Sequence, residues 1–286
     1  MDRRMGSGQL RAAAEAEVKL AAALLTNGAA SRALCRAAAL AAGVAGWTAF
    51  DDADQHTAAD HYRASIRLAS RAEDAELVVY FSAQLAHQQI SDGQPYTALR
   101  LLETVLGGTA AGAASPPTLA AAHTARAHAH ARLGDPTTHA RAMNDAHRAL
   151  AQSSPHDSSL LNAWVDTACL WIDTATHLVH LGQPHRALDH FRSDCVTDRL
   201  LRGDPRKAVF ALVHEARAHL GAGDLDAAIT RAHQAVDHLN AIQSRSAVAA
   251  VIALYKSLAT HQSTTSNTGI HDLRSRLDSS PLPGRV

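Results

Sequence analysis

Histidine is the residue type that most suggests chemistry in this sequence, with 19 among 286 residues. Asp173, His177 and His180 are spaced i, i+4 and i+7, so a helix would carry them on one stripe, and all three are of zinc-ligand type. A helix rises by about 1.5 Å per residue, which spreads these side chains over roughly 10 Å, too far for one ion unless a second helix contributes. We therefore expect solvated or hydrogen-bonded histidines, no metal site and no cofactor.

The catalytic motifs that a sequence can reveal are missing. The chain has no Gly-rich phosphate loop with lysine, no G-x-S-x-G elbow and no H-E-x-x-H. Its three cysteines, Cys35, Cys169 and Cys195, show no C-x-x-C spacing, which argues against a disulfide framework or a cysteine-built zinc site. We expect no catalytic residue and no enzyme activity. The cysteine usage favours a reducing, cytoplasmic location.

Two arginines are the better candidates for ligand contacts. Arg132 and Arg217 each carry a guanidinium fork, which suits a carboxylate or phosphate held by two hydrogen bonds. The competing explanation is a structural ion pair with Asp173 or Glu215. The residues themselves leave this choice open.

Trp47 and Phe50 stand out because only 4% of the residues are aromatic. They lie three residues apart in "AGWTAFDDAD", which is close to one helical turn, so they would form an aromatic wall. Aromatic residues at helical spacing are most often core residues, and Trp47 packed against a preceding helix is an equally good interpretation.

Charge and hydropathy exclude two classes of partner. The 27 basic and 27 acidic side chains cancel, which does not fit the electropositive surface of a nucleic-acid or anionic-membrane binder. Glu15, Glu17 and Lys19 interrupt what would otherwise be an apolar signal core, so the N-terminal segment reads as an amphipathic helix. No run of about 18 apolar residues elsewhere indicates a membrane span.

The elements that position these residues are helices separated by turns. The chain is rich in Ala and Leu, lacks strand alternation, and is broken by Gly, Pro and Ser clusters. The clearest breaks are "GGTAAGAASPPT" from Gly107, "SSPHDSS" from Ser153 and "STTSNTG" from Ser263, which we expect to be surface loops. We expect the terminal residues 1–8 and 279–286 to be disordered.

One turn motif repeats along the chain. Gly93, Gly134, Gly182 and Gly223 each follow one helical run and precede another, at spacings of 41, 48 and 41 residues, and Ala53 stands 40 residues before Gly93. Glycine supplies the left-handed conformation that ends a helix, and a proline two residues after three of these glycines starts the next one.

The second helix of each unit repeats a small residue followed four positions later by a large one. The small residue lets the two helices of a pair approach, and the larger one fills the space beside it. The small positions are Ala58, Ala98, Ala187 and Ala228, and the large ones are Tyr62, Leu102 and Phe191. The third unit, with His139 and Met143, and the fifth, with Ala232 in the large position, match less well.

This pattern resembles the tetratricopeptide repeat, although the period exceeds the usual length of about 34 residues. From roughly Arg11 to Asp278 the segments "AGWTAFDDAD", "AQLAHQQISDGQPYTAL", "ARAHAHARLGDPTTHARAM" and "HLVHLGQPHRALDHF" look like the C-terminal sensory region of actinobacterial helix-turn-helix regulators. The DNA-binding domain of that family is missing from the sequence. The resemblance implies a free-standing sensory module or a fragment of a longer regulator, with a role in transcription regulation.

We predict an all-α chain in which residues 9–278 form a right-handed, tetratricopeptide-like solenoid of about five repeats. Its first helices would line a groove that binds a protein or peptide partner, or a small anionic ligand, with no direct nucleic acid or membrane contact and with a possible homodimer. The alternative is a constitutive adaptor without a signalling ligand. The expected ligand-binding residues are Trp47, Phe50, Tyr80, Gln84, His87, His128, Arg132, Asp173, Thr176, His180, His214 and Arg217. Asp51, Thr124, Ile172 and Phe210 are expected to face the same groove.

Overall fold

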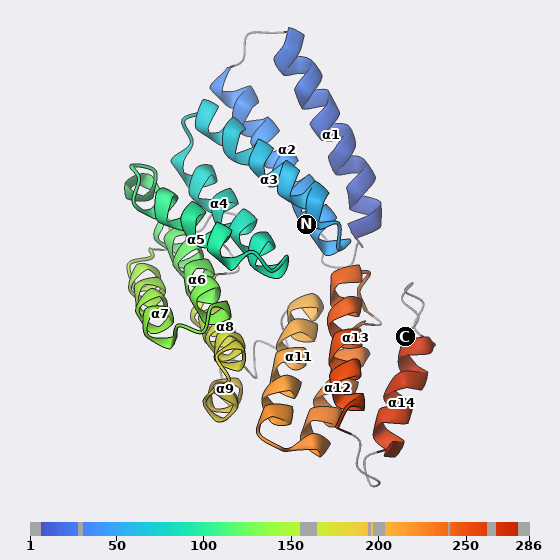
Figure 1. The fold of residues 1–286 in the computed structure, drawn as a ribbon. Coiled ribbons are helices and arrows are strands. Elements are labelled where there is room, and N and C mark those ends of the chain that lie inside the picture. Colours follow the sequence, from blue (N-terminus) through green and yellow to red (C-terminus); the bar gives the residue numbers. More distant parts are fainter. Residues whose placement is uncertain are drawn as a thin grey trace. The chain divides into compact units, whose positions relative to one another are not determined.

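The computed structural model describes residues 7–27, 31–154, 165–193, 196, 204–239, 241–261 and 267–279 (Figure 1). These residues form α-helices and one short 3-10 helix, without a strand, so the predicted all-α class is confirmed for the described part of the chain. Cys195 and most of the two terminal segments predicted to be disordered lie outside the described residues. The helices are α1 (Ser7–Asn27), α2 (Arg32–Asp51), α3 (Gln55–Arg71), α4 (Ala75–Ser91), α5 (Pro95–Leu106), η1 (Ala111–Ala113), α6 (Pro116–Arg132), α7 (Pro136–Ala151), α8 (Thr167–His180), α9 (Pro184–Phe191), α11 (Pro205–Gly221), α12 (Leu225–Leu239), α13 (Arg245–Ala259) and α14 (Asn267–Asp278).

The chain divides into two compact units. Gly8–Leu170 is called the N-terminal unit below, and Trp171–Val286 is called the C-terminal unit. In the N-terminal unit α2 packs on α3, α4 on α5 and α6 on α7, and α4 also contacts α6. In the C-terminal unit the last ten residues of α8 pack with α9 and α11, and α11 packs on α12. Consecutive helices therefore form pairs within each unit.

The turns that join the helices of a pair have the predicted conformation. Ala53, Gly93, Gly134, Gly182 and Gly223 all have positive φ, between 61° and 83°. In the first turn the Asp54 N–H donates to the Ala49 carbonyl at 2.9 Å, the six-to-one bond of a Schellman motif. The carboxylate of Asp54 then accepts from the Thr57 N–H at 3.2 Å and caps α3. One turn thus ends a helix and begins the next.

The structure adds a turn of this kind that the glycine pattern does not show. Glu73 has φ 54°, the Asp74 N–H donates to Ala69 O at 3.0 Å, and Asp74 caps α4 through the Leu77 N–H. This turn joins α3 to α4, and so connects two successive pairs. Because its left-handed residue is not glycine, composition gave no signal for it.

The small and large positions of the second helices pack as predicted. Ala58, Ala98, Ala187 and Ala228 have no exposed surface, and the large residues Tyr62, Leu102 and Phe191 are buried beside them. The weaker matches His139, Met143 and Ala232 are buried as well. The positions that the repeat pattern marks on the second helices are therefore buried in all five described pairs.

Helix α2 approaches its neighbours through two glycines. A Cβ on Gly43 would lie 2.0 Å from Cε1 of Phe81 on α4, and one on Gly46 would lie 2.9 Å from the Tyr62 ring on α3. Among the described helices α2 alone is long and apolar enough to cross a membrane, with mean hydropathy 1.4. Half of that stretch is buried inside the structure, as in the core helix of a helical bundle.

Helix α1 confirms the predicted N-terminal helix but is only weakly amphipathic. Arg11 ties it to the turn after α2, donating to Asp52 and Asp54 at 2.9 Å each. Its other side carries Leu20 and Leu24, which are 62% and 50% exposed. A helix that packs on one side only leaves part of an alanine- and leucine-rich sequence uncovered.

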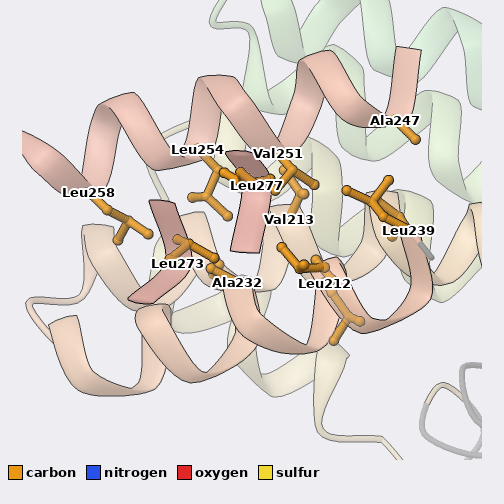
Figure 2. Packing of buried hydrophobic residues seen from close by; sticks show 14 of the residues in the cluster. Leu212, Val213, Ala232, Leu239, Ala247, Val251, Leu254, Leu258, Leu273 and Leu277 are labelled. Carbon is orange, nitrogen blue, oxygen red and sulfur yellow. The ribbon is translucent and has the colours of Figure 1, made fainter. Parts of the chain in front are cut away.

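Four helices supply the core of the C-terminal unit. Figure 2 shows aliphatic side chains of α11, α12, α13 and α14 converging in one cluster. Leu254 and Leu258 on α13 and Leu273 on α14 have no exposed surface. Helices α13 and α14 therefore close the core beyond the last recognisable repeat.

Candidate binding site

Three rings from successive first helices meet in the N-terminal unit. The Phe50 ring on α2 lies 5.6 Å from the His87 ring on α4, edge to face. The His87 ring lies 5.9 Å from the His128 ring on α6, at an angle of 44°. We call Phe50, His87 and His128 the ring row. Sequence analysis placed all three among the binding residues, and the structure brings them together.

Small residues set the separation of the helices that carry the ring row. Ala83 and Ala86 of α4 belong to the same buried cluster as Ala125 and Ala129 of α6. Without larger side chains between them, the two helices approach closely enough for residues at their edges to touch. The alanines of the repeat therefore position His87 against His128.

His87 combines exposure with a desolvated ring. Its side chain is exposed, while the protein around it desolvates the charged form and holds the pKa of His87 below its ordinary value. No Asp or Glu of the described residues lies within ion-pair distance of the ring. A neutral imidazole with an accessible edge can donate or accept a hydrogen bond.

Arg132 lies one helical turn beyond His128. It is the last residue of α6 and is exposed. Within the described part of the N-terminal unit its side chain makes no hydrogen bond or ion pair. An arginine at a helix C-terminus also interacts favourably with the helix dipole, which is a structural reason for its presence. Asp173 belongs to the other unit, and its pairing with Arg132 stays a prediction.

The remaining N-terminal candidates lie near the ring row without joining it. Trp47 and Gln84 are half-buried on α2 and α4. Tyr80 is half-buried and packs edge-on against the buried Phe81 at 5.1 Å. Phe50 itself packs against the core cluster of α2, α3 and α4, so its ring has a structural role as well. A separate aromatic wall of Trp47 and Phe50 stays a prediction.

Two residues expected to face an open groove are buried. Asp51 is 2% exposed and lies near Tyr62, whose pKa is raised chiefly by burial and further by the charges of Tyr80 and Asp51. Thr124 is 8% exposed, and its hydroxyl donates to the Ala120 carbonyl at 2.8 Å within α6. Neither side chain is available to a ligand, because each points into the helix packing.

The C-terminal unit repeats the contact between histidines. The rings of His180 on α8 and His214 on α11 are 5.4 Å apart and edge to face. Asp173, Thr176 and Arg217 are half-buried on the same two helices. Ile172 and Phe210 are half-buried and pack against the two hydrophobic clusters of this unit, so they have a structural role as well.

The structure bears on two alternatives from the sequence: an ion pair between Arg217 and Glu215, and a metal site on the Asp173, His177 and His180 stripe. Glu215 is 5% exposed, and its carboxylate forms an ion pair with Arg231 of α12, with Nε and Oε1 3.0 Å apart. Its observed partner is therefore Arg231. His177, the middle residue of the predicted stripe, is buried. Across the described residues no three His, Cys, Asp or Glu side chains gather as metal ligands would.

Sequence analysis missed a set of polar contacts within the helix pairs. His219 and Asp224 flank the turn of the fifth pair with Nδ1 and Oδ2 3.5 Å apart, and His130 and Asp135 flank the third at 3.7 Å. Burial lowers the pKa of both histidines, and the nearby aspartate opposes this. The signal was present, because each histidine stands four residues before a turn glycine and each aspartate one residue after it.

The chain described so far belongs to the class of all-α proteins built from consecutive helix pairs. No protein-family model matches it, and no curated protein matches it. Among solved structures it is similar to BtubC (BKLC) from P. vanneervenii, with a TM-score of 0.52 and a match that covers 83% of this chain and 92% of that one. The two sequences are 17% identical, so this similarity supports the helical fold alone.

Proposed function

We propose that this protein is a regulatory module that binds an extended peptide, or a small ligand with an anionic group, on the inner face of a right-handed tetratricopeptide-like solenoid. The observation that carries the proposal is the ring row. Residues from three successive first helices touch one another, as expected if first helices line one surface. Such a surface would act through a partner protein, as in the cytoplasmic transcription regulators that the sequence resembles.

Arg132 is the proposed anchor for the anionic group. Its guanidinium is exposed, lies one turn from His128, and has no carboxylate partner among the described residues of its unit. A carboxylate held there by two charge-assisted hydrogen bonds would stabilise the complex by about 1.5–3 kcal/mol. The aromatic and imidazole rings would provide apolar and polar contacts along the rest of the peptide.

A constitutive adaptor is the second candidate, and exposed apolar residues favour it. Leu20 and Leu24 lie one turn apart on α1, and Tyr96 at the start of α5 is 72% exposed. Exposed apolar side chains away from the ring row suit a partner that binds the outer face. In that case substitutions in the ring row would leave partner binding intact.

Peptide selection followed by calorimetry tests the proposal. A displayed library of random hexapeptides is selected on the wild-type protein, and the enriched peptide is titrated into wild type, Arg132→Ala and Arg100→Ala. Arg100 is an exposed arginine on α5 and serves as the matched control. We expect acidic peptides to be enriched, and Arg132→Ala to lose roughly ten- to a hundredfold in affinity. Arg100→Ala should bind as wild type does.

Two results would count against the proposal. Equal affinity for Arg132→Ala and wild type would remove Arg132 from the site and favour the adaptor. A lower melting temperature for Arg132→Ala without peptide would assign the residue a structural role. Circular dichroism melts of the three proteins separate these outcomes from a true binding defect.

A further inference from the structure

The middle residue of the ring row, His87, is a histidine whose surroundings could couple ligand binding to proton uptake. His87 is exposed on α4, with the uncharged Phe50 facing it from α2 and the His128 ring facing it from α6. Its backbone carbonyl accepts from the Ser91 hydroxyl at 3.0 Å, which is a contact within α4. The imidazole itself stays accessible beside a second imidazole.

Among the described residues of the other elements that pack on α4, no charged side chain shifts the pKa of this ring. Helix α3 meets α4 through the Gln88 amide, which donates to the Gln55 carbonyl at 3.1 Å. Helix α5 meets it through the apolar cluster that contains Ile90 and Leu102. The η1 segment is Ala-Gly-Ala and carries no ionisable group. Arg132 stands one helical turn beyond His128 at the end of α6 and is exposed.

We propose that His87 binds the anionic group of the ligand together with Arg132, and that it takes up a proton when the ligand binds. The proposal rests on the function proposed above and specifies how that site responds to pH. Without an acidic partner among the described residues, the imidazolium form of His87 lacks a counter-charge until a carboxylate arrives. The carboxylate supplies one, and the rings of Phe50 and His128 lie beside the ion pair.

The direction of the pH dependence follows from proton linkage. The protein desolvates the charged form and lowers the pKa of His87 in the free state. A bound carboxylate favours the charged form and raises the pKa again, so the complex holds more protons than the free protein between the two pKa values. Affinity should therefore increase as the pH falls through this interval, by at most about tenfold per pH unit for one proton.

Calorimetric titration with a capped tetraglutamate, acetyl-(Glu)4-amide, tests this inference. Its carboxylates titrate near pH 4.3, so they stay ionised over a series from about pH 5.5 to 8. We expect the association constant to rise as the pH falls, with proton uptake visible as different heats in two buffers of unequal ionisation enthalpy. His87→Asn should lose most of the pH dependence while binding at pH 8 changes little.

His147→Asn is the matched control. His147 lies on α7, away from the ring row, and burial lowers its pKa too. This variant should keep the wild-type pH dependence. A wild-type affinity that does not change with pH, or an equal pH dependence in His87→Asn, would overturn the inference and leave the proposed function standing. No binding of tetraglutamate at any pH would overturn both.

Discussion

At the scale of single residues, ion pairs join the two helices of a pair. Glu215 on α11 accepts from Arg231 on α12 at 3.0 Å, and burial raises the pKa of Glu215 despite this partner. In the third pair the signs are reversed, with Arg126 on α6 donating to Asp145 on α7 at 2.5 Å. Ion pairs of opposite polarity in equivalent pairs favour each helix packing with its own partner.

Removing Arg231 should destabilise the fold in a pH-dependent way. Arg231→Ala leaves the Glu215 carboxylate buried without its counter-charge, at a cost of about 1–3 kcal/mol near pH 8, a range reduced because Arg231 is itself partly exposed. A raised carboxyl pKa means that Glu215 contributes stability below its unfolded pKa and loses it as the pH rises. The penalty should therefore shrink towards pH 4.5. Urea titrations at the two pH values measure it, and an equal penalty at both would contradict the prediction.

At the scale of elements, turns and close helix contacts are set by a few small residues. The left-handed residue and the following Asp or Gln end one helix and begin the next in every pair. Gly43 and Gly46 give α2 its close approach to Phe81 and Tyr62. These local choices place the ring-bearing edges of α2 and α4 side by side.

Gly43→Ala should destabilise the protein even though alanine is the better helix former. The new Cβ would lie 2.0 Å from Phe81 Cε1, so the buried ring must move, at a cost of about 1–3 kcal/mol for overpacking. The gain from removing a glycine inside a helix is roughly 0.5–1 kcal/mol. We expect a net loss in chemical denaturation. Gly112→Ala, where the Cβ meets nothing within 4 Å, is the control and should change little. A more stable Gly43→Ala would show that the helices separate at little cost.

At the scale of the whole molecule, histidines determine how the fold responds to acid. The structure lowers the pKa of five of them chiefly by desolvation, namely His87, His123, His130, His147 and His219. The unfolded chain binds protons near its ordinary histidine pKa, while the folded chain resists them. These groups contribute stability above that pKa, and the contribution is lost as the pH falls.

The urea midpoint should therefore decrease between pH 7.5 and pH 5.5. The raised pKa of Glu215 makes the folded state more stable at low pH, which is the opposite effect. The five histidines named above should outweigh this single carboxyl group. A midpoint that is constant or higher at pH 5.5 would contradict the assignment of these histidines as desolvated.

The repeat could be predicted from sequence because its signals are local. The turn residues, and the alanines that stand five positions after four of them, depend on neighbours in the chain, and the structure shows these turns with positive φ and these alanines buried. The turn at Glu73 could not be predicted from sequence, since a glutamate does not indicate a left-handed backbone conformation. For the candidate site, sequence indicated which residues lie on first helices. It could not place Asp51 and Thr124 in the interior, because that depends on the rotation of each helix against its neighbour.

The turns also influence how the chain folds. In each turn the helix-ending residue and the helix-starting residue are neighbours, so pairing two helices closes a loop of only a few residues and costs little chain entropy. Contacts between nearby segments form before distant ones, and proteins rich in such contacts fold quickly. Each helix pair can therefore form as soon as its own residues leave the ribosome, and later pairs add onto a surface that is already folded.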